Sequence, residues 1–115
     1  MKVSGKKVGD TMVIDVSGRV IGDASTEMRR DINGWLSEIP QEQKPKVVLA
    51  LDGVTMMDSS GLGALVSSYT SVQKREGRLV LAGLGRGLQN LIAITKLAKV
   101  FDVYENEEEA IKSFQ

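Results

Sequence analysis

The sequence predicts an α/β fold, in which a mixed and mostly parallel sheet of about five strands is flanked by about four helices. Strand-like and helix-like segments alternate along the chain, as they do where helices cross over between parallel strands. Residues 47–51 form a continuous apolar run, which is typical of a strand that is covered on both faces. The length of 115 residues suits one domain, so we expect residues 1–115 to fold as a single unit.

The N-terminal part predicts an antiparallel hairpin followed by a helix. Apolar and polar residues alternate over residues 11–16, which predicts a strand that ends at Ser17-Gly18. Residues 6–8 can pair with it across the two-residue Gly9-Asp10 turn. Over residues 25–39 apolar side chains recur at helical spacing, with Asp23 or Ser25 available as the N-cap and Pro40 as the stop.

The rest of the chain predicts strands at 46–52, 78–82 and 100–104. A helix should follow the first of these and end before Gly77 as its C′ residue, because its apolar residues share one face: Leu62, Leu65, Val66, Tyr69 and Val72. A second short helix should contain Leu88, Leu91, Ile92 and Thr95. Asn106 should cap a terminal helix whose first turn holds three glutamates, where the helix dipole favours anions. In such sheets partners usually meet the carboxyl ends of the strands, here 18–25, 53–60 and 83–87.

Composition excludes several classes of function. Fifteen basic and fifteen acidic residues give a net charge of zero, which argues against a nucleic-acid-binding protein. The chain has neither Cys nor His, so the usual zinc ligands, thiol nucleophiles and general bases are missing, and we expect no enzyme, no metal and no cofactor. No apolar run approaches the ~18 residues of a membrane span, and no secretory signal opens the chain. We therefore expect a cytoplasmic protein.

One segment, residues 54–63, is unusual on physical grounds. It runs from the buried strand into a helix and places two adjacent hydroxyls, Ser59 and Ser60, behind Asp58. Met56 and Met57 beside it would be costly to expose unless the core or a partner covers them. A purely structural interpretation makes Asp58 or Ser59 the N-cap, with the following glycines needed for close helix–sheet packing.

The run Met57-Asp58-Ser59-Ser60-Gly61-Leu62-Gly63 resembles the signature of bacterial anti-sigma factor antagonists, the STAS-domain family. The resemblance covers essentially the whole chain and implies a single STAS domain. It also implies that Ser59 is phosphorylated by a partner that is both anti-sigma factor and serine kinase. The unphosphorylated antagonist binds this partner and so releases a sigma factor, and a serine phosphatase resets the switch. The expected partner-binding residues are Asp23, Met56, Met57, Asp58, Ser60, Gly61, Leu62 and Gly63.

The position of Ser59 suits such a switch. A phosphate adds about −1.5 to −2 charge, and the free N–H groups of a helix N-terminus accommodate it without refolding. Asp58 next to it makes the modified edge strongly acidic, so a partner surface fitted to a neutral hydroxyl would be repelled. Asp23 is expected on the same edge, either as a partner contact or as a plain helix cap.

Other interpretations fit the sequence less well. A serine hydrolase would need a Gly-x-Ser-x-Gly elbow and a base, and both are missing. A receiver domain would use Asp52 as its phosphoacceptor, but the acidic pair that holds its Mg²⁺ is missing from the end of the early strand. Residues 83–87 lack the spacing of a dinucleotide-binding fingerprint. The remaining alternative keeps the fold and makes the chain a STAS scaffold or adaptor subunit in a stress-signalling or lipid-transport complex. Zero net charge also permits a homodimer.

Overall fold

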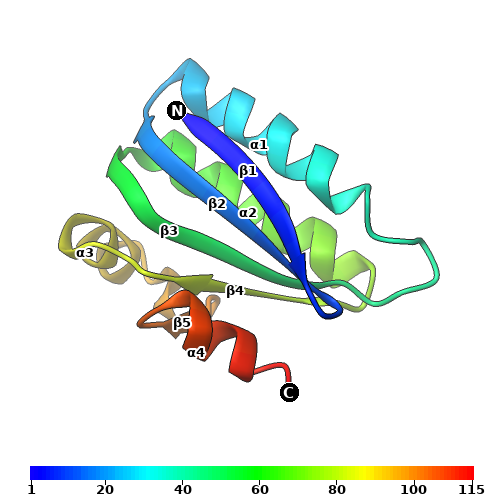
Figure 1. Cartoon of the computed structure of the whole chain (residues 1–115). Coiled ribbons are helices and arrows are strands. Elements are labelled where there is room, and N and C mark those ends of the chain that lie inside the picture. Colours follow the sequence, from blue (N-terminus) through cyan, green and yellow to red (C-terminus); the bar gives the residue numbers. More distant parts are fainter.

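The computed structural model describes residues 1–115 and contains one five-stranded sheet with the order β1-β2-β3-β4-β5 (Figure 1). The elements follow one another in the predicted order. They are β1 (Lys2–Val8), β2 (Thr11–Val20), α1 (Asp23–Leu36), β3 (Lys46–Met57), α2 (Ser59–Lys74), β4 (Arg78–Ala82), α3 (Arg86–Ile94), the short 3₁₀ helix η1 (Leu97–Lys99), β5 (Val103–Tyr104) and α4 (Glu107–Lys112).

Pairing within the sheet confirms the predicted fold class. β1 and β2 are antiparallel and joined at the Gly9-Asp10 turn, where Gly9 has a φ of 65°. The pairs β2–β3, β3–β4 and β4–β5 are all parallel. The sheet is therefore parallel except for the N-terminal hairpin.

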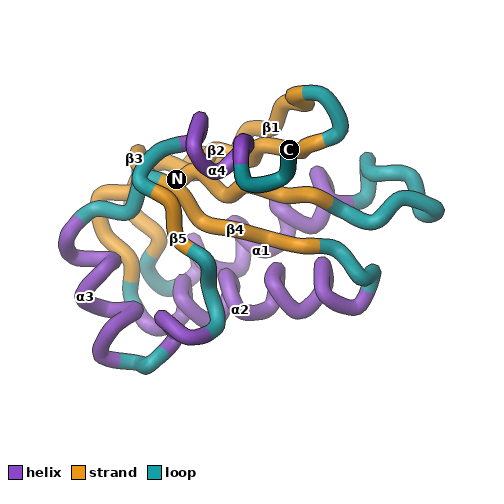
Figure 2. Tube along the Cα trace, turned by 90° about the horizontal axis from the view of Figure 1, so that it is seen from below, coloured by secondary structure: helices purple, strands orange, loops and turns teal.

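Helices cover the two faces of the sheet unequally. α1, α2 and α3 lie on one face, whereas α4 lies on the other (Figure 2). The larger apolar core lies under the first three helices, with Ile14, Leu49 and Leu65 among its fully buried residues. A smaller cluster under α4 contains Val13 and Ala110. None of the helices combines the length and the apolar character needed to cross a membrane.

Four strand lengths differ from the sequence prediction. β1 is longer than the predicted residues 6–8 and comprises Lys2–Val8, because its pairing with β2 continues to Ser17. β2 does not end at Ser17-Gly18 but continues to Val20, because its pairing with β3 continues to Met57. Gly18, with a φ of 93°, lies at an irregularity of this pairing and lets the strand pass it. β3 therefore runs five residues past the predicted end. β5 is shorter than predicted and comprises only Val103–Tyr104, because the backbone N–H groups of Val100 and Phe101 bond to the carbonyl of Leu97 and so close the turn of η1.

The predicted helix ends also need correction. α1 begins at Asp23 with Gly22 as its N-cap, so neither Asp23 nor Ser25 is the cap residue. Ser25 instead donates its hydroxyl to the Gly22 carbonyl at 2.7 Å. α1 ends at Leu36, before Ile39 and Pro40.

At the end of α2, the left-handed residue is Glu76, with a φ of 58°, and not Gly77. Gly77 is required for a different reason, because a Cβ there would lie 2.4 Å from the carbonyl oxygen of Pro45.

Two arginines tie peripheral segments to this frame. Arg75, the C-cap of α2, donates to the carbonyls of Leu36, Ile39, Pro40 and Gln43 at 2.7–3.3 Å, and so holds the segment that leaves α1.

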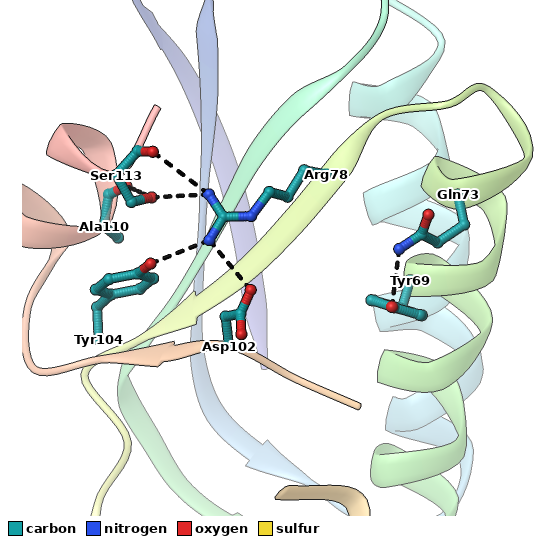
Figure 3. A network of polar contacts seen from close by, with 7 residues as sticks. All are labelled: Tyr69, Gln73, Arg78, Asp102, Tyr104, Ala110 and Ser113. Atoms are coloured by element: carbon teal, nitrogen blue, oxygen red, sulfur yellow. Dashed lines mark hydrogen bonds and ion pairs between the residues drawn. The ribbon is translucent and has the colours of Figure 1, made fainter. Parts of the chain in front are cut away.

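Arg78 of β4 anchors the C-terminal segment. It contacts Asp102 at 3.1 Å, the Tyr104 hydroxyl at 3.0 Å and the Ser113 hydroxyl at 3.2 Å (Figure 3). The hydrogen bond from this guanidinium holds the pKa of Tyr104 below its usual value.

Candidate functional site

The residues of the unusual segment gather where β2 and β3 end and α1 and α2 begin. The backbone N–H of Asp58 donates to the carbonyl of Val20 at 3.3 Å. The backbone N–H of Gly22 in turn donates to Oδ2 of Asp58 at 3.1 Å. The carboxyl ends of two parallel strands and the N-termini of two helices therefore meet at Asp58, as the topology predicted.

Asp58 is the N-cap of α2, which settles the choice between it and Ser59. Its Oδ1 accepts hydrogen bonds from the backbone N–H groups of Ser60 at 3.0 Å and Gly61 at 3.1 Å, and also from the Ser60 hydroxyl. These bonds, the one from the Ser60 hydroxyl first, hold the pKa of Asp58 below its ordinary value. The carboxylate is therefore ionised at neutral pH and fully engaged within the protein.

The two adjacent serines have different surroundings. Ser59 is the first residue of α2, is exposed and has no hydrogen-bond partner for its hydroxyl. Ser60 is also exposed, but its hydroxyl donates to Asp58. A phosphoryl donor that approaches this edge meets a free hydroxyl at Ser59, directly at the N-terminus of a 16-residue helix.

The flanking residues divide between surface and core. Met56 is 55% exposed at the end of β3, whereas Met57 is half-buried against the larger core. Gly61 is buried, and a Cβ there would lie 2.6 Å from Cγ of Met57. Leu62 is only 3% exposed and packs in the core, so its side chain is not part of the surface. Gly61 therefore has the close-packing role proposed from the sequence.

Gly63 does not have that role. A Cβ added to Gly63 would meet no atom within 4 Å, so nothing in the fold requires a glycine there. Asp23, exposed, follows Gly22 directly and is the only acidic residue in the first turn of α1. Its carboxylate thus lies on the same edge as Asp58, in the favourable field of the helix N-terminus, although it is not the N-cap.

Two hollows flank the start of α2: the larger lies at two of the strand ends where a partner was expected, whereas no sequence pattern indicated the smaller. The larger, of about 370 Å³, lies between the end of β3 and the start of α3; it is lined by residues 54–57 and 85–88 and includes Met56 and Arg86. The smaller, of about 160 Å³, lies between α1 and α2 and is lined by Ser25, Thr26, Arg29, Ser60, Gly63 and Ala64. Arg86 belongs to the segment 83–87 that was expected at this edge, whereas Arg29 reaches the site only through the packing of α1 on α2, so no motif signals it.

Comparisons with known proteins agree with this fold. The family model of the STAS domain matches residues 2–110. The chain is 24% identical over 104 residues to the anti-sigma F factor antagonist of Paenibacillus polymyxa, with 90% of this chain and 86% of that protein aligned. It is 38% identical over 68 residues to the anti-sigma-B factor antagonist of Listeria monocytogenes, an alignment of 57% of this chain and 60% of the relative. The solved structure of the Bacillus cell fate determinant SpoIIAA in its phosphorylated form shares the fold, with a TM-score of 0.69, 19% identity and coverage of 99% and 100% of the two chains.

Proposed function

The chain belongs to the STAS domain family, and on that premise we propose that it is an anti-sigma factor antagonist switched by phosphorylation of Ser59. In the unphosphorylated form it binds an anti-sigma factor and so frees a sigma factor. In the phosphorylated form this binding is lost. The observation that carries the proposal is the exposed, unpartnered hydroxyl of Ser59 at the start of α2.

Phosphorylation of Ser59 needs a partner enzyme, because antagonists of this family are non-enzymatic and the chain holds no His or Cys to activate the hydroxyl. The Ser59 oxygen would attack the γ-phosphorus of an ATP bound to a serine kinase. The bond from that phosphorus to the β–γ bridging oxygen breaks, ADP leaves, and the hydroxyl proton passes to a base of the kinase. The partner thus unites anti-sigma factor and kinase, and a serine phosphatase hydrolyses the phosphoserine. All three proteins act in the cytoplasm.

The effect of the phosphate is electrostatic and local. The new group would stand beside the ionised Asp58 and on the same edge as Asp23. A partner surface that closes over a neutral hydroxyl, over the exposed Met56 and over the bare backbone at Gly63 would then have to desolvate a cluster of negative charges. The helix N-terminus keeps the phosphorylated chain folded. The packing beneath this surface consists of Met57, Gly61 and Leu62. The hydrogen bonds between Asp58 and Ser60 fix the backbone at its edge.

Binding measurements with three forms of the chain test this function. The chain with Ser59, the Ser59→Ala variant and a chain with phosphoserine installed at position 59 during translation are used to capture partners from a lysate of the source bacterium. The kinase-like partner is then purified, and its affinity for each form is measured by calorimetry. We expect Ser59 and Ser59→Ala to bind alike, and phosphoserine to weaken binding roughly tenfold or more, the effect of ~1.4 kcal/mol of repulsion. Equal affinities for all three forms would exclude the switch.

A further inference from the structure

The smaller hollow, between α1 and α2, has a composition suited to an anion. Its lining contains the hydroxyl-bearing Ser25, Thr26 and Ser60 and the guanidinium of Arg29, and no carboxylate. Arg29 is exposed and forms no ion pair, whereas its neighbour Arg30 lies against Glu27 and Asp31. The hydroxyls of Ser25 and Ser60 already donate to Gly22 and Asp58, so the hollow offers an anion the unpaired guanidinium of Arg29 and the hydroxyl of Thr26.

Gly63 keeps this hollow open. A glycine inside a helix costs about 0.5–1 kcal/mol relative to alanine, so its presence at an exposed helical position calls for a reason. Packing supplies none, because a Cβ at Gly63 would meet open space. The space that this side chain would fill is the hollow itself, since Gly63 lines it.

Ser59 does not itself line this hollow, but its neighbour Ser60 does, so Ser59 stands next to it in the first turn of α2. It is four residues before Gly63 in α2, and residues four apart lie on the same face of a helix. On the other side, Thr26 and Arg29 are three residues apart in α1 and likewise share a face. The carboxylates of Asp58 and Asp23 stand at the N-terminal edge, so they would drive an anion on Ser59 away from themselves and toward Arg29.

We propose that Arg29, in the hollow that Gly63 keeps open, receives the phosphoryl group of phosphorylated Ser59. This inference rests on the proposed function, because it concerns the modified form of the same residue. It makes Arg29 a positioning residue, which fixes the phosphate in one orientation over α1 and α2. The phosphorylated face then presents the paired phosphate to the partner, and Arg29 is no longer free to contact the partner itself.

Phosphorus NMR of the phosphorylated chain tests the contact without any partner. Phosphoserine is installed at position 59 during translation, and the second pKa of the phosphate is determined by pH titration in the otherwise unchanged chain, in Arg29→Gln and in Gly63→Leu. A nearby guanidinium stabilises the dianion, so we expect Arg29→Gln to raise this pKa by about 0.2–0.7 units, the range that an exposed ion pair gives. Gly63→Leu fills the hollow and should raise it in the same direction. Thermal unfolding of each variant confirms that it is folded.

Two arginines serve as matched controls. Arg30→Gln removes an exposed cation from the same helix and should leave the phosphate pKa as in the parent chain. Arg86→Gln removes the cation of the larger hollow and should also leave it unchanged. An unaltered pKa in Arg29→Gln overturns the inference, and so does a rise in Arg86→Gln alone, which would place the phosphate in the other hollow. Because no kinase is used, this result is independent of whether a cellular kinase modifies Ser59, the point on which the proposed function depends.

Discussion

The backbone N–H of Gly22 and the carboxylate of Asp58, 36 residues apart in sequence, form a hydrogen bond of 3.1 Å. Oδ2 of Asp58 thus accepts a hydrogen bond from Gly22, the N-cap residue of α1, while Oδ1 caps the N-terminus of α2. The N-termini of both helices are fixed to each other at the point where the candidate acceptor Ser59 stands. The position of Ser59 is therefore set by a carboxylate whose two oxygens both accept hydrogen bonds within the protein.

Removing the charge of Asp58 should lower the stability of the chain, and the size of this loss should depend on pH. Asp58→Asn keeps a side chain that can cap a helix but loses the negative charge, so we expect a lower urea midpoint than in the parent chain at pH 7. The pKa of Asp58 is lowered in the folded state, so the unfolded chain binds the proton first as the pH falls. The advantage of the parent chain should be complete above the ordinary Asp pKa of 3.8, decrease as the pH falls below that value, and disappear once the pH has passed through the lowered pKa of the folded state. A difference that does not change between pH 7 and pH 3 would contradict this account.

The two glycines of the motif should respond oppositely to alanine. Gly61→Ala places a Cβ 2.6 Å from Met57 and 3.0 Å from Val20, so we expect overpacking to cost about 1–3 kcal/mol of unfolding free energy. Gly63→Ala meets no atom within 4 Å and should instead stabilise the helix by about 0.5–1 kcal/mol. Chemical denaturation of the two variants side by side measures both effects. An equal loss of unfolding free energy in both variants would contradict the close packing described around Gly61.

Substitutions at Leu62 and Met56 should distinguish a residue of the core from a residue of the candidate binding surface. Leu62→Ala opens a cavity at a side chain that is 3% exposed, and we expect a loss of about 2–5 kcal/mol in unfolding free energy. Met56→Ala changes a side chain that is 55% exposed, so stability should stay within about 0.5 kcal/mol of the parent chain. Affinity for the captured partner should fall for Met56→Ala. Unchanged affinity in that variant would remove Met56 from the partner surface.

Arg75 should prove to be a strong determinant of stability that is remote from the candidate site. Its guanidinium donates hydrogen bonds to four backbone carbonyls between Leu36 and Gln43. Without it, these hydrogen bonds must be replaced by hydrogen bonds from water. We expect Arg75→Met to lose about 2 kcal/mol, the scale of hydrogen bonds to a charged group. Urea denaturation measures the loss, and Lys74→Met, an exposed neighbour on α2, is the control. A loss no larger than that of the control would show that the guanidinium does not hold this segment.

Local patterns were sufficient to predict the order of the elements, the hairpin and the cap of α4. Asn106 illustrates why, because its Oδ1 accepts from the N–H of Glu109, three residues ahead, and a cap of this kind depends only on neighbouring residues. The ends of β2 and β3 could not be predicted in the same way. Gly18 suggested a stop, yet pairing with a strand more than 30 residues away carries β2 past it.

The candidate site shows the same division. Asp58, Ser59 and Ser60 are contiguous, so one sequence motif contains both the cap and the candidate acceptor. Gly77 was expected to end α2 through its backbone conformation, whereas its true constraint is the carbonyl of Pro45 across the fold. Arg29 could not be found from the sequence, because it lies on a different helix and meets the site only through the packing of α1 on α2.

The most direct test of the central claim is the mapping of the phosphorylated residue. The chain and its Ser59→Ala and Ser60→Ala variants are incubated with ATP and a lysate of the source bacterium that has demonstrated kinase activity, and their intact masses and modified peptides are determined. We predict one phosphoryl group on Ser59, present in the chain and in Ser60→Ala and absent from Ser59→Ala. An unmodified chain, or a phosphoryl group on Ser60 or Asp52, would contradict the assignment of Ser59 as the switch.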